Sequence, residues 1–198
     1  MSVVAIRDRR AERYAATRRE IIDAAWEVVR ADGLGAISMR DLGARVGMRA
    51  QSLYGYFPSK EAIFDAMFAE SNEELLGRVE ALPTVPDPVD WMRSMARMFM
   101  QFCVEDPGRY QLLFQRPIPN FEPSAEALAP ALQGLAMVRA GLRDCGITDE
   151  RAFDAWTGVT GGLAAQQNAN EPGGDRWVRL VDEVIDMYIE HYRPNTPR

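Results

Sequence analysis

The sequence predicts an all-α protein in which a small N-terminal domain of three helices precedes a larger helical domain, with the boundary near residue 60. Three observations support this fold class. Apolar residues recur at helical spacing along most of the chain, and no segment shows the alternation of a half-buried strand. Hydrophobic residues make up 47% of the 198 residues, enough for a sizeable core. Clusters of proline and glycine divide the periodic stretches into segments of helix length.

The first helix is expected over residues 17–32. Its apolar stripe is that of an amphipathic helix and consists of Ile21, Ile22, Ala25, Val28 and Val29. Thr17 and Glu20 match a capping box at its start, and Gly33 is a natural stop. The preceding segment "RRAERYAA" also favours helix, so the helix could begin earlier. Alternatively, the arginines before residue 17 form a mobile basic arm.

Two short helices and a long one are expected next. Ser38, with an acid three residues later, should cap a short helix that ends at Gly47. After a three-residue turn, a second short helix is expected at about residues 49–56. Pro58 breaks the chain, and Ser59 then caps the long helix.

The remainder of the chain is expected to form five further helices. A loop with three prolines in nine residues, "LPTVPDPVD", separates them from the long helix. We expect them at about residues 88–104, 108–115, 124–145, 149–168 and 175–192. Pro130 should kink or delay the third of them. The last helix is apolar over most of its circumference, so one side should meet its own domain and the other a partner chain.

Composition argues against several classes of protein. No run of about 18 apolar residues is present and the N-terminus lacks the apolar stretch of a signal peptide, so we expect no membrane span and a cytoplasmic location. His191 is the single histidine, and Cys103 and Cys145 lie far apart, so neither a metal site nor a disulfide framework is expected. With no nucleophile–histidine pair and no phosphate-binding loop, nothing in the sequence indicates an enzyme or a cofactor.

Charge is distributed unevenly along the chain. Residues 1–60 carry 11 basic and 7 acidic side chains, net +4, whereas residues 61–198 carry 12 and 22, net -10, and +4 - 10 gives the -6 of the whole chain. The only lysine, Lys60, stands at the end of the basic part. A basic end on an acidic body suggests a local contact with a polyanion.

Residues 38–57 have the spacing of a helix-turn-helix. Gly43 would allow the two short helices to cross closely, and Gly47 would tolerate a positive φ in the turn. The expected core positions are Leu42, Val46, Met48, Leu53 and Phe57. The side chains left outside contain no acid, and arginine and glutamine among them are suited to base edges, hydroxyls to phosphate.

The stretch "ISMRDLGARVGMRAQSLYGYFPSKEAIF" closely resembles the DNA-binding domain of the tetracycline repressor (TetR) family, and the resemblance covers about residues 17–68. Two residues that the resemblance places on DNA have another explanation: Tyr56 could pack on the first helix, and Arg40 could simply be solvated. A cation at a helix start opposes the macrodipole, which favours a phosphate contact for Lys60. The DNA contacts that the resemblance implies fall into three groups: Ser38 and Arg40 before or in the first short helix; Arg49, Ala50, Gln51 and Ser52 facing bases; and Tyr54, Tyr56 and Lys60 on phosphates.

"DPGRYQLLF" and "AFDAWTGVTGG" resemble a common subclass of the family's C-terminal domain, in which a histidine follows the tryptophan by one turn. Here Thr160 stands in that place. The resemblance implies that residues 61–198 bind a small molecule and form a homodimer through the helices at about 149–168 and 175–192. Methionine and aromatic residues suit an apolar ligand, although at this spacing they are also typical of a core. The candidate ligand contacts are Met95, Phe99, Tyr110, Phe114, Trp156 and Thr160.

The sequence therefore predicts a homodimeric transcriptional repressor that a small, largely apolar ligand releases from a palindromic double-stranded DNA operator. Residues 1–60 would form the DNA-binding domain with its N-terminal arm, and residues 61–198 the ligand-binding and dimerisation domain. Two alternatives remain: a repressor that binds DNA without any ligand, and a small all-α carrier or enzyme.

Overall fold

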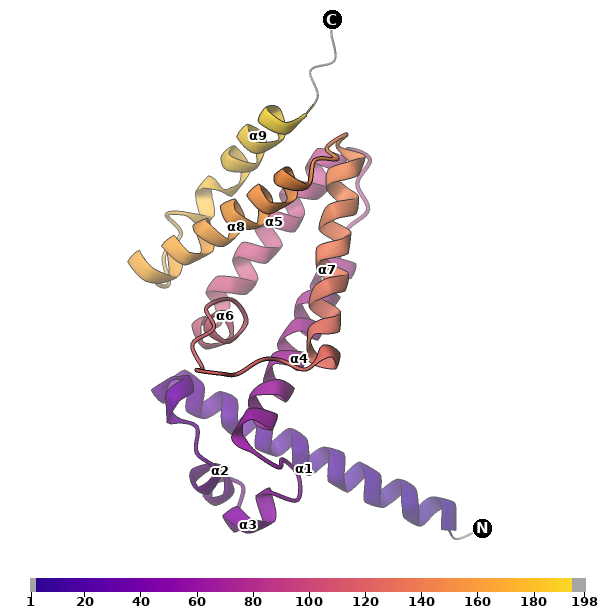
Figure 1. Cartoon of the computed structure of the whole chain (residues 1–198), viewed down its shortest axis with the longest axis vertical. Coiled ribbons are helices and arrows are strands. Elements are labelled where there is room, and N and C mark those ends of the chain that lie inside the picture. Colours follow the sequence, from indigo (N-terminus) through magenta and orange to yellow (C-terminus); the bar gives the residue numbers. More distant parts are fainter. Residues whose placement is uncertain (1–2, 194–198) are drawn as a thin grey trace, which may run out of the picture. The chain divides into compact units, whose positions relative to one another are not determined.

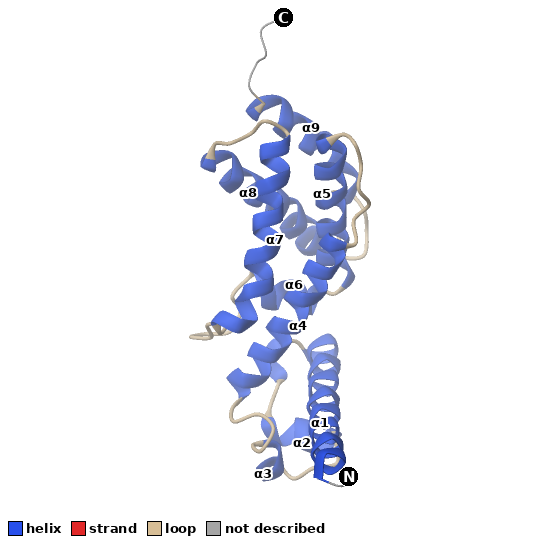
Figure 2. Ribbon diagram, turned by 90° about the vertical axis from the view of Figure 1, so that its right-hand side faces the viewer, coloured by secondary structure: helices blue, strands red, loops and turns tan. Residues whose placement is uncertain are grey.

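The computed structural model describes residues 3–193, and every regular element in that span is helical (Figures 1 and 2). This confirms the predicted all-α class. The α-helices are α1 (Val3–Asp32), α2 (Met39–Arg45), α3 (Ala50–Leu53), α4 (Lys60–Glu80), α5 (Pro88–Glu105), α6 (Pro107–Phe114), α7 (Ala125–Asp144), α8 (Glu150–Asn170) and α9 (Val181–Tyr192). Two short 3-10 helices, η1 (Leu34–Ala36) and η2 (Val178–Leu180), precede α2 and α9.

The chain divides into two compact units. The first unit comprises the chain up to Glu70 together with Gln111–Ala127, and the second unit comprises Ser71–Tyr110 together with the chain from Leu128 onward. The units do not coincide with a division at residue 60, because α4 contributes to both and the segment between α6 and α7 joins the first. The division into a DNA-binding and a ligand-binding domain stays a prediction.

Helix α1 begins well before the predicted start. Thr17 lies in its interior, so the interpretation of Thr17 as a helix cap is wrong, and the alternative of an earlier start is confirmed. The residues before it are mostly alanine, arginine and glutamate, which continue a helix at little cost. Gly33 ends the helix as expected, with a φ of 83° and an N–H that donates to the Val29 carbonyl at 2.9 Å.

Helices α2 and α4 start at the predicted caps. The Ser38 hydroxyl oxygen accepts from the Asp41 N–H at 3.1 Å, and that of Ser59 accepts from the Ala62 N–H at 3.2 Å. Helix α3 is shorter than expected, since it ends at Leu53 and Tyr54–Tyr56 form a turn. Gly55 lies in that turn, where a helix is least favoured.

In the second unit, α5 packs against both α8 and α9. The buried face of α5 consists of Val89, Met92, Met95, Ala96, Met100, Phe102 and Cys103. Tyr188 of α9 is also buried, and its hydroxyl donates to the Ala152 carbonyl of α8 at 2.6 Å. None of the helices within residues 3–193 is long and apolar enough to cross a membrane.

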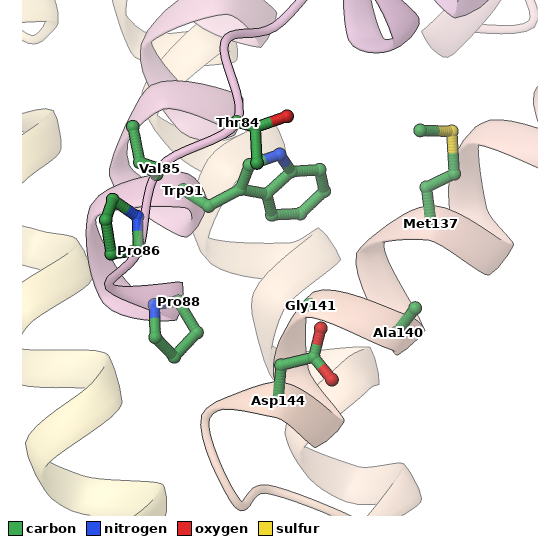
Figure 3. A pocket seen from close by; sticks show the side chains of 9 residues that line it. All are labelled: Thr84, Val85, Pro86, Pro88, Trp91, Met137, Ala140, Gly141 and Asp144. Atoms are coloured by element: carbon green, nitrogen blue, oxygen red, sulfur yellow. The ribbon is translucent and has the colours of Figure 1, made fainter.

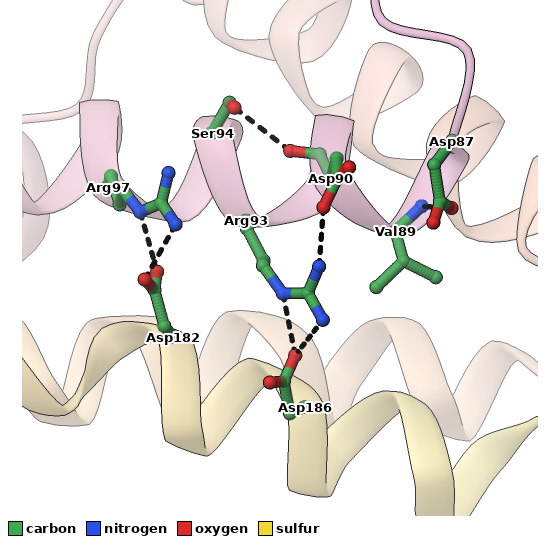
Figure 4. Close-up of polar contacts among 8 residues, drawn as sticks. All are labelled: Asp87, Val89, Asp90, Arg93, Ser94, Arg97, Asp182 and Asp186. Carbon is green, nitrogen blue, oxygen red and sulfur yellow. Dashed lines mark hydrogen bonds and ion pairs between the residues drawn. The ribbon is translucent and has the colours of Figure 1, made fainter.

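Two arginines of α5 bind aspartates of α9 at the surface (Figure 4). Arg97 contacts Asp182 at 2.6 Å, and Arg93 contacts Asp186 at 2.7 Å. The hydrogen bond from Arg97 lowers the pKa of Asp182. Because these groups are partly exposed, each pair adds only a modest stabilisation of the α5–α9 contact.

The expected bounds of the last helices need two corrections. Helix α9 begins at Val181 and not at residue 175, because side chains hold the preceding backbone in turns. The Gln167 amide oxygen accepts from the Trp177 N–H, and the Glu171 carboxylate accepts from the Arg176 N–H, each at 2.9 Å. Pro130 does not delay α7, which starts at Ala125 and continues through it.

Candidate nucleic-acid interface

The first unit holds α2 and α3 at close range through Gly43. A Cβ at this position would lie 3.0 Å from the Met48 carbonyl oxygen and 3.3 Å from the Ala50 nitrogen, so only glycine fits without displacing the backbone. Gly47 has a φ of 68°, which glycine adopts without strain. Both features match the predicted helix-turn-helix.

The orientation of α3 follows from two buried side chains. Leu53 and Phe57 are 0% and 1% exposed, so they face inward as predicted. The opposite side of α3 is open to solvent and carries no acid; it consists of Arg49, Gln51, Ser52 and Tyr54. Ala50 is half-buried, and its backbone lies against Gly43.

Helix α1 supports the turn that follows α3, which confirms the alternative that Tyr56 packs on the first helix. The sequence analysis did not identify the supporting residues, Tyr14 and Arg18. The Tyr14 ring stacks on the Tyr56 ring with centroids 5.0 Å apart, and the Tyr14 hydroxyl donates to the Gly55 carbonyl at 3.3 Å. Arg18 donates from Nη1 to the Tyr56 carbonyl at 2.5 Å and lies 4.0 Å from the centroid of the Phe57 ring. The one-turn spacing of Tyr14 and Arg18 before the apolar stripe was the available signal.

The side chains at the start of α2 are already engaged with one another. The Ser38 hydroxyl donates to Asp41 Oδ2 at 2.6 Å, and this bond is the largest cause of the lowered pKa of the Asp41 carboxyl. Arg40 Nε lies 3.6 Å from the same carboxylate, although its side chain is 89% exposed. Arg40 is therefore accessible to a phosphate, whereas Ser38 would have to exchange its partner.

Lys60 is the first residue of α4 and is half-buried, with Nζ 5.3 Å from the centroid of the Phe64 ring. Glu61 follows it, and hydrogen bonds with its own backbone N–H and with Ser59 lower the pKa of its carboxyl. The start of α4 thus presents the Lys60 ammonium beside the Glu61 carboxylate, which is already hydrogen-bonded to the helix start.

The segment between α6 and α7 packs on α4 within the first unit. Asp65 accepts from the Ser124 N–H at 2.7 Å and from its hydroxyl at 2.8 Å. The Phe121 ring lies 5.9 Å from Phe64 and 6.4 Å from Phe68, measured between centroids. This segment connects α6 with α7 and contacts the helix that begins at Lys60.

The six candidate ligand contacts do not share one environment. Met95, Tyr110, Trp156 and Thr160 are buried, and the Thr160 hydroxyl donates to the Trp156 carbonyl at 2.9 Å. Phe99 is half-buried, and Phe114 is 42% exposed and belongs to the first unit, unlike the others.

A pocket of about 450 Å³ lies elsewhere in the second unit, between the α4–α5 loop, the start of α5 and the end of α7 (Figure 3). None of the candidate ligand contacts lines it. Sequence reasoning treated its proline-containing loop only as a connection. The lining residues are Thr84, Val85, Pro86, Pro88, Trp91, Met137, Ala140, Gly141 and Asp144.

Helices α2 and α3 cross closely at Gly43, and the exposed side of α3 carries no acid. These features define a helix-turn-helix protein, and the comparison with protein families agrees. Residues 21–67 match bacterial regulatory proteins of the tetR family, and residues 92–192 match the tetracyclin repressor-like C-terminal domain. The chain belongs to the TetR family of transcriptional regulators.

Among curated relatives, the HTH-type transcriptional repressor DrrR1 of Streptomyces coeruleorubidus is 27% identical over 172 residues, covering 84% of this chain and 58% of DrrR1. Another relative is covered over 52% of its length, so the chain spans little more than half of these proteins.

Solved structures share the fold. The fatty acid degradation regulator FadR from Bacillus halodurans has a TM-score of 0.69 and 16% identity, with 87% of this chain and 94% of FadR covered. A TetR variant from Acinetobacter baumannii AYE in complex with minocycline has a TM-score of 0.58 and 19% identity, with 87% and 93% covered.

Proposed function

We propose that the protein is a homodimeric transcriptional repressor that binds a palindromic operator in the cytoplasm and is released by a small, largely apolar ligand. The observation that carries the DNA-binding part is the exposed, acid-free side of α3, held by the contact of Gly43 with the turn. Family membership supports the same reading.

In this proposal, some side chains on the exposed side of α3 contact bases and others contact phosphates. Arg49 and Gln51 reach base edges in the major groove, where both can make two hydrogen bonds to one base. The half-buried Ala50 offers only a methyl group to the groove. Ser52 faces the bases beside them. Tyr54 places its hydroxyl on a phosphate, a contact that sets the register but carries no sequence information.

The flanking elements supply further phosphate contacts. Arg40 is the most exposed of them, and Ser38, the N-cap residue of α2, lies two residues before it. Lys60 combines with the N–H groups at the start of α4, where an anion is favoured. The Tyr56 ring stacks on the Tyr14 ring, which would fix the position of the Tyr56 hydroxyl as a phosphate contact.

The proposed dimer uses α8 and α9. Met187 of α9 and Leu180, just before α9, are 62% and 39% exposed, so a partner that covered them would remove apolar surface from water. A Cβ on Gly158, Gly161 or Gly162 of α8 would meet nothing within 4 Å, so close packing within this chain does not account for the three glycines. A second copy of α8 would use the space.

Release by a ligand requires a ligand that binds better to a form with a different spacing of the two α3 helices. The segment that contains Phe121 and Ser124 supports such a coupling, since it packs on α4 and continues into α7. The minocycline complex of a protein with the same fold supports a small-molecule effector. The proposed effector contacts remain Met95, Phe99, Tyr110, Phe114, Trp156 and Thr160.

Selection of DNA from a random pool by the purified protein tests the proposal. We expect enrichment of a palindrome whose half-sites lie about one DNA turn (~34 Å) or a multiple apart. Gln51→Ala should then relax the sequence preference, whereas Lys60→Ala and Tyr54→Phe should weaken binding to every sequence at moderate salt. A wild-type dimer that enriches no sequence, or a Gln51→Ala protein with unchanged preference, would contradict the assignment.

A repressor that needs no ligand is a second candidate. Met95, Tyr110 and Trp156 are buried in the core, and the Thr160 hydroxyl is hydrogen-bonded within the chain. Because these groups already have contacts within the protein, they favour this second candidate. A thermal-shift screen against lipophilic compounds separates the two. Compounds that raise the melting temperature and lower DNA affinity support the regulated form, and a screen without any such compound supports the second.

A further inference from the structure

The pocket at the end of α7 is preformed by rigid elements. Pro86 and Pro88 fix the backbone of its loop side, and Asp87 between them caps α5 by accepting from the Val89 N–H at 2.8 Å. On the other side, α7 contributes Met137, Ala140, Gly141 and Asp144. A wall that is ordered before binding loses little entropy when a ligand enters.

Trp91 and Gly141 form the wall where the two sides meet. A Cβ on Gly141 would lie 2.5 Å from Trp91 Cζ3 and 2.6 Å from Met92 Sδ, so the indole rests directly on the backbone of α7. Met92, whose sulfur also lies against Gly141, is fully buried. Figure 3 shows the indole and the Met137 side chain around the same space.

Charge in the pocket has one sign. Asp144 is the only charged residue among the nine that line it, and it is exposed as the last residue of α7. An acid at this end opposes the helix macrodipole, so Asp144 is not there to stabilise the helix. Burial is the main cause of the raised pKa of the neighbouring Cys145 thiol, and Arg193 acts against it, whereas the charges of Asp87 and Asp144 raise this pKa further.

We propose that this pocket binds an organic monocation with an apolar body, with the cation between the Trp91 indole and the Asp144 carboxylate and the body against Val85, Pro86 and Met137. An indole face is the best aromatic partner for a cation. The volume of about 450 Å³ suits a small drug-sized molecule. The site is separate from the proposed effector contacts, and it does not depend on DNA binding.

Isothermal titration calorimetry with benzyltriethylammonium tests the proposal, and N,N-diethylbenzamide serves as an uncharged probe of similar size. We expect the cation to bind the full chain with a Kd of about 1 mM or tighter. Asp144→Asn should weaken cation binding roughly fivefold and leave the benzamide unaffected. Because Asp144 is exposed, this variant should fold normally.

A matched pair on α7 tests the place of binding. Ala140 lines the pocket, so Ala140→Phe should fill it and reduce binding of the cation at least tenfold. Ala136, one turn earlier and exposed, lies outside the pocket, so Ala136→Phe should leave binding unchanged. Absence of binding to the wild type, equal affinity in Asp144→Asn, or equal effects of the two phenylalanines would each overturn the proposal, whatever the protein does on DNA.

Discussion

Arg18 of α1 donates a hydrogen bond of 2.5 Å to the backbone carbonyl of Tyr56, and its guanidinium covers the Phe57 ring. These two contacts join α1 to the end of the α3 turn, 38 residues away in the chain. A helix of four residues, as α3 is, has little stability of its own, so its position depends on such contacts.

Replacement of Arg18 should therefore loosen α3, the helix proposed to read DNA. We expect Arg18→Ala to lower the free energy of unfolding by about 2 kcal/mol, from the lost charge-assisted hydrogen bond and the lost contact with the ring. Urea denaturation measures this, and DNA affinity should fall in parallel.

The neighbouring arginine provides the control. Arg19 pairs with Asp23 and Glu70 at 3.0 and 3.1 Å but is 61% exposed, so Arg19→Ala should cost less than about 1 kcal/mol. Equal losses in the two variants would show that Arg18 has no special role at the turn.

Gly43 should be intolerant of any side chain. The methyl group of Gly43→Ala would press on the Met48 carbonyl and the Ala50 nitrogen, and backbone atoms cannot move aside cheaply. We expect a loss of about 1–3 kcal/mol in unfolding free energy and weaker DNA binding. Gly35→Ala, where a Cβ meets nothing within 4 Å, should stay within about 0.5 kcal/mol of the wild type. A Gly43→Ala protein as stable as Gly35→Ala would contradict the close crossing of α2 and α3.

Much of the fold was accessible from the sequence because its boundaries carry local chemical signals. Ser38, Ser59 and Gly33 act at the ends of helices as predicted. The outward side of α3 was also predictable, since the inward positions of Leu53 and Phe57 determine it.

The errors arose where distant or side-chain contacts decide the structure. Thr17 has the sequence of a cap, but favourable helix formers precede it and α1 continues. Arg18 holds the turn that follows α3, and Gln167 holds the backbone before α9, and neither residue is adjacent in sequence to the backbone that it binds. The pocket was not foreseen because Trp91 and Gly141 lie 50 residues apart, and only the folded chain brings them together.

Tyr188 should give the second unit a defined sensitivity to alkaline pH. Burial is the main reason why the pKa of its hydroxyl is raised, and the hydroxyl donates to the Ala152 carbonyl. A group whose pKa is higher in the folded state stabilises the protein fully below its unfolded pKa of about 10, and the contribution is lost as the pH rises above that value.

The variant Tyr188→Phe should show both effects. At neutral pH we expect its free energy of unfolding to be about 1–2 kcal/mol lower than that of the wild type, because the buried hydrogen bond is gone. As the pH then rises above about 10, the free energy of unfolding should fall less in the variant than in the wild type. Tyr54→Phe, at a tyrosine that is 52% exposed, should match the wild type at both. Urea denaturation across this pH range checks the expectation, and parallel curves for Tyr188→Phe and the wild type would refute it.

The contact of Trp91 with Gly141 leads to the last prediction. A methyl group on Gly141 would overlap the indole at 2.5 Å and the buried Met92 sulfur at 2.6 Å, and a ring cannot bend away as a flexible side-chain end can. Gly141→Ala should therefore lower the free energy of unfolding by about 1–3 kcal/mol, although alanine favours helix by about 1 kcal/mol over glycine. Gly134 lies on the same helix, and a Cβ there meets nothing within 4 Å, so Gly134→Ala should show only the gain in helix propensity. The sign of the change is thus opposite at two glycines of α7, and thermal denaturation of the two variants decides whether Trp91 packs against this helix as closely as the geometry indicates.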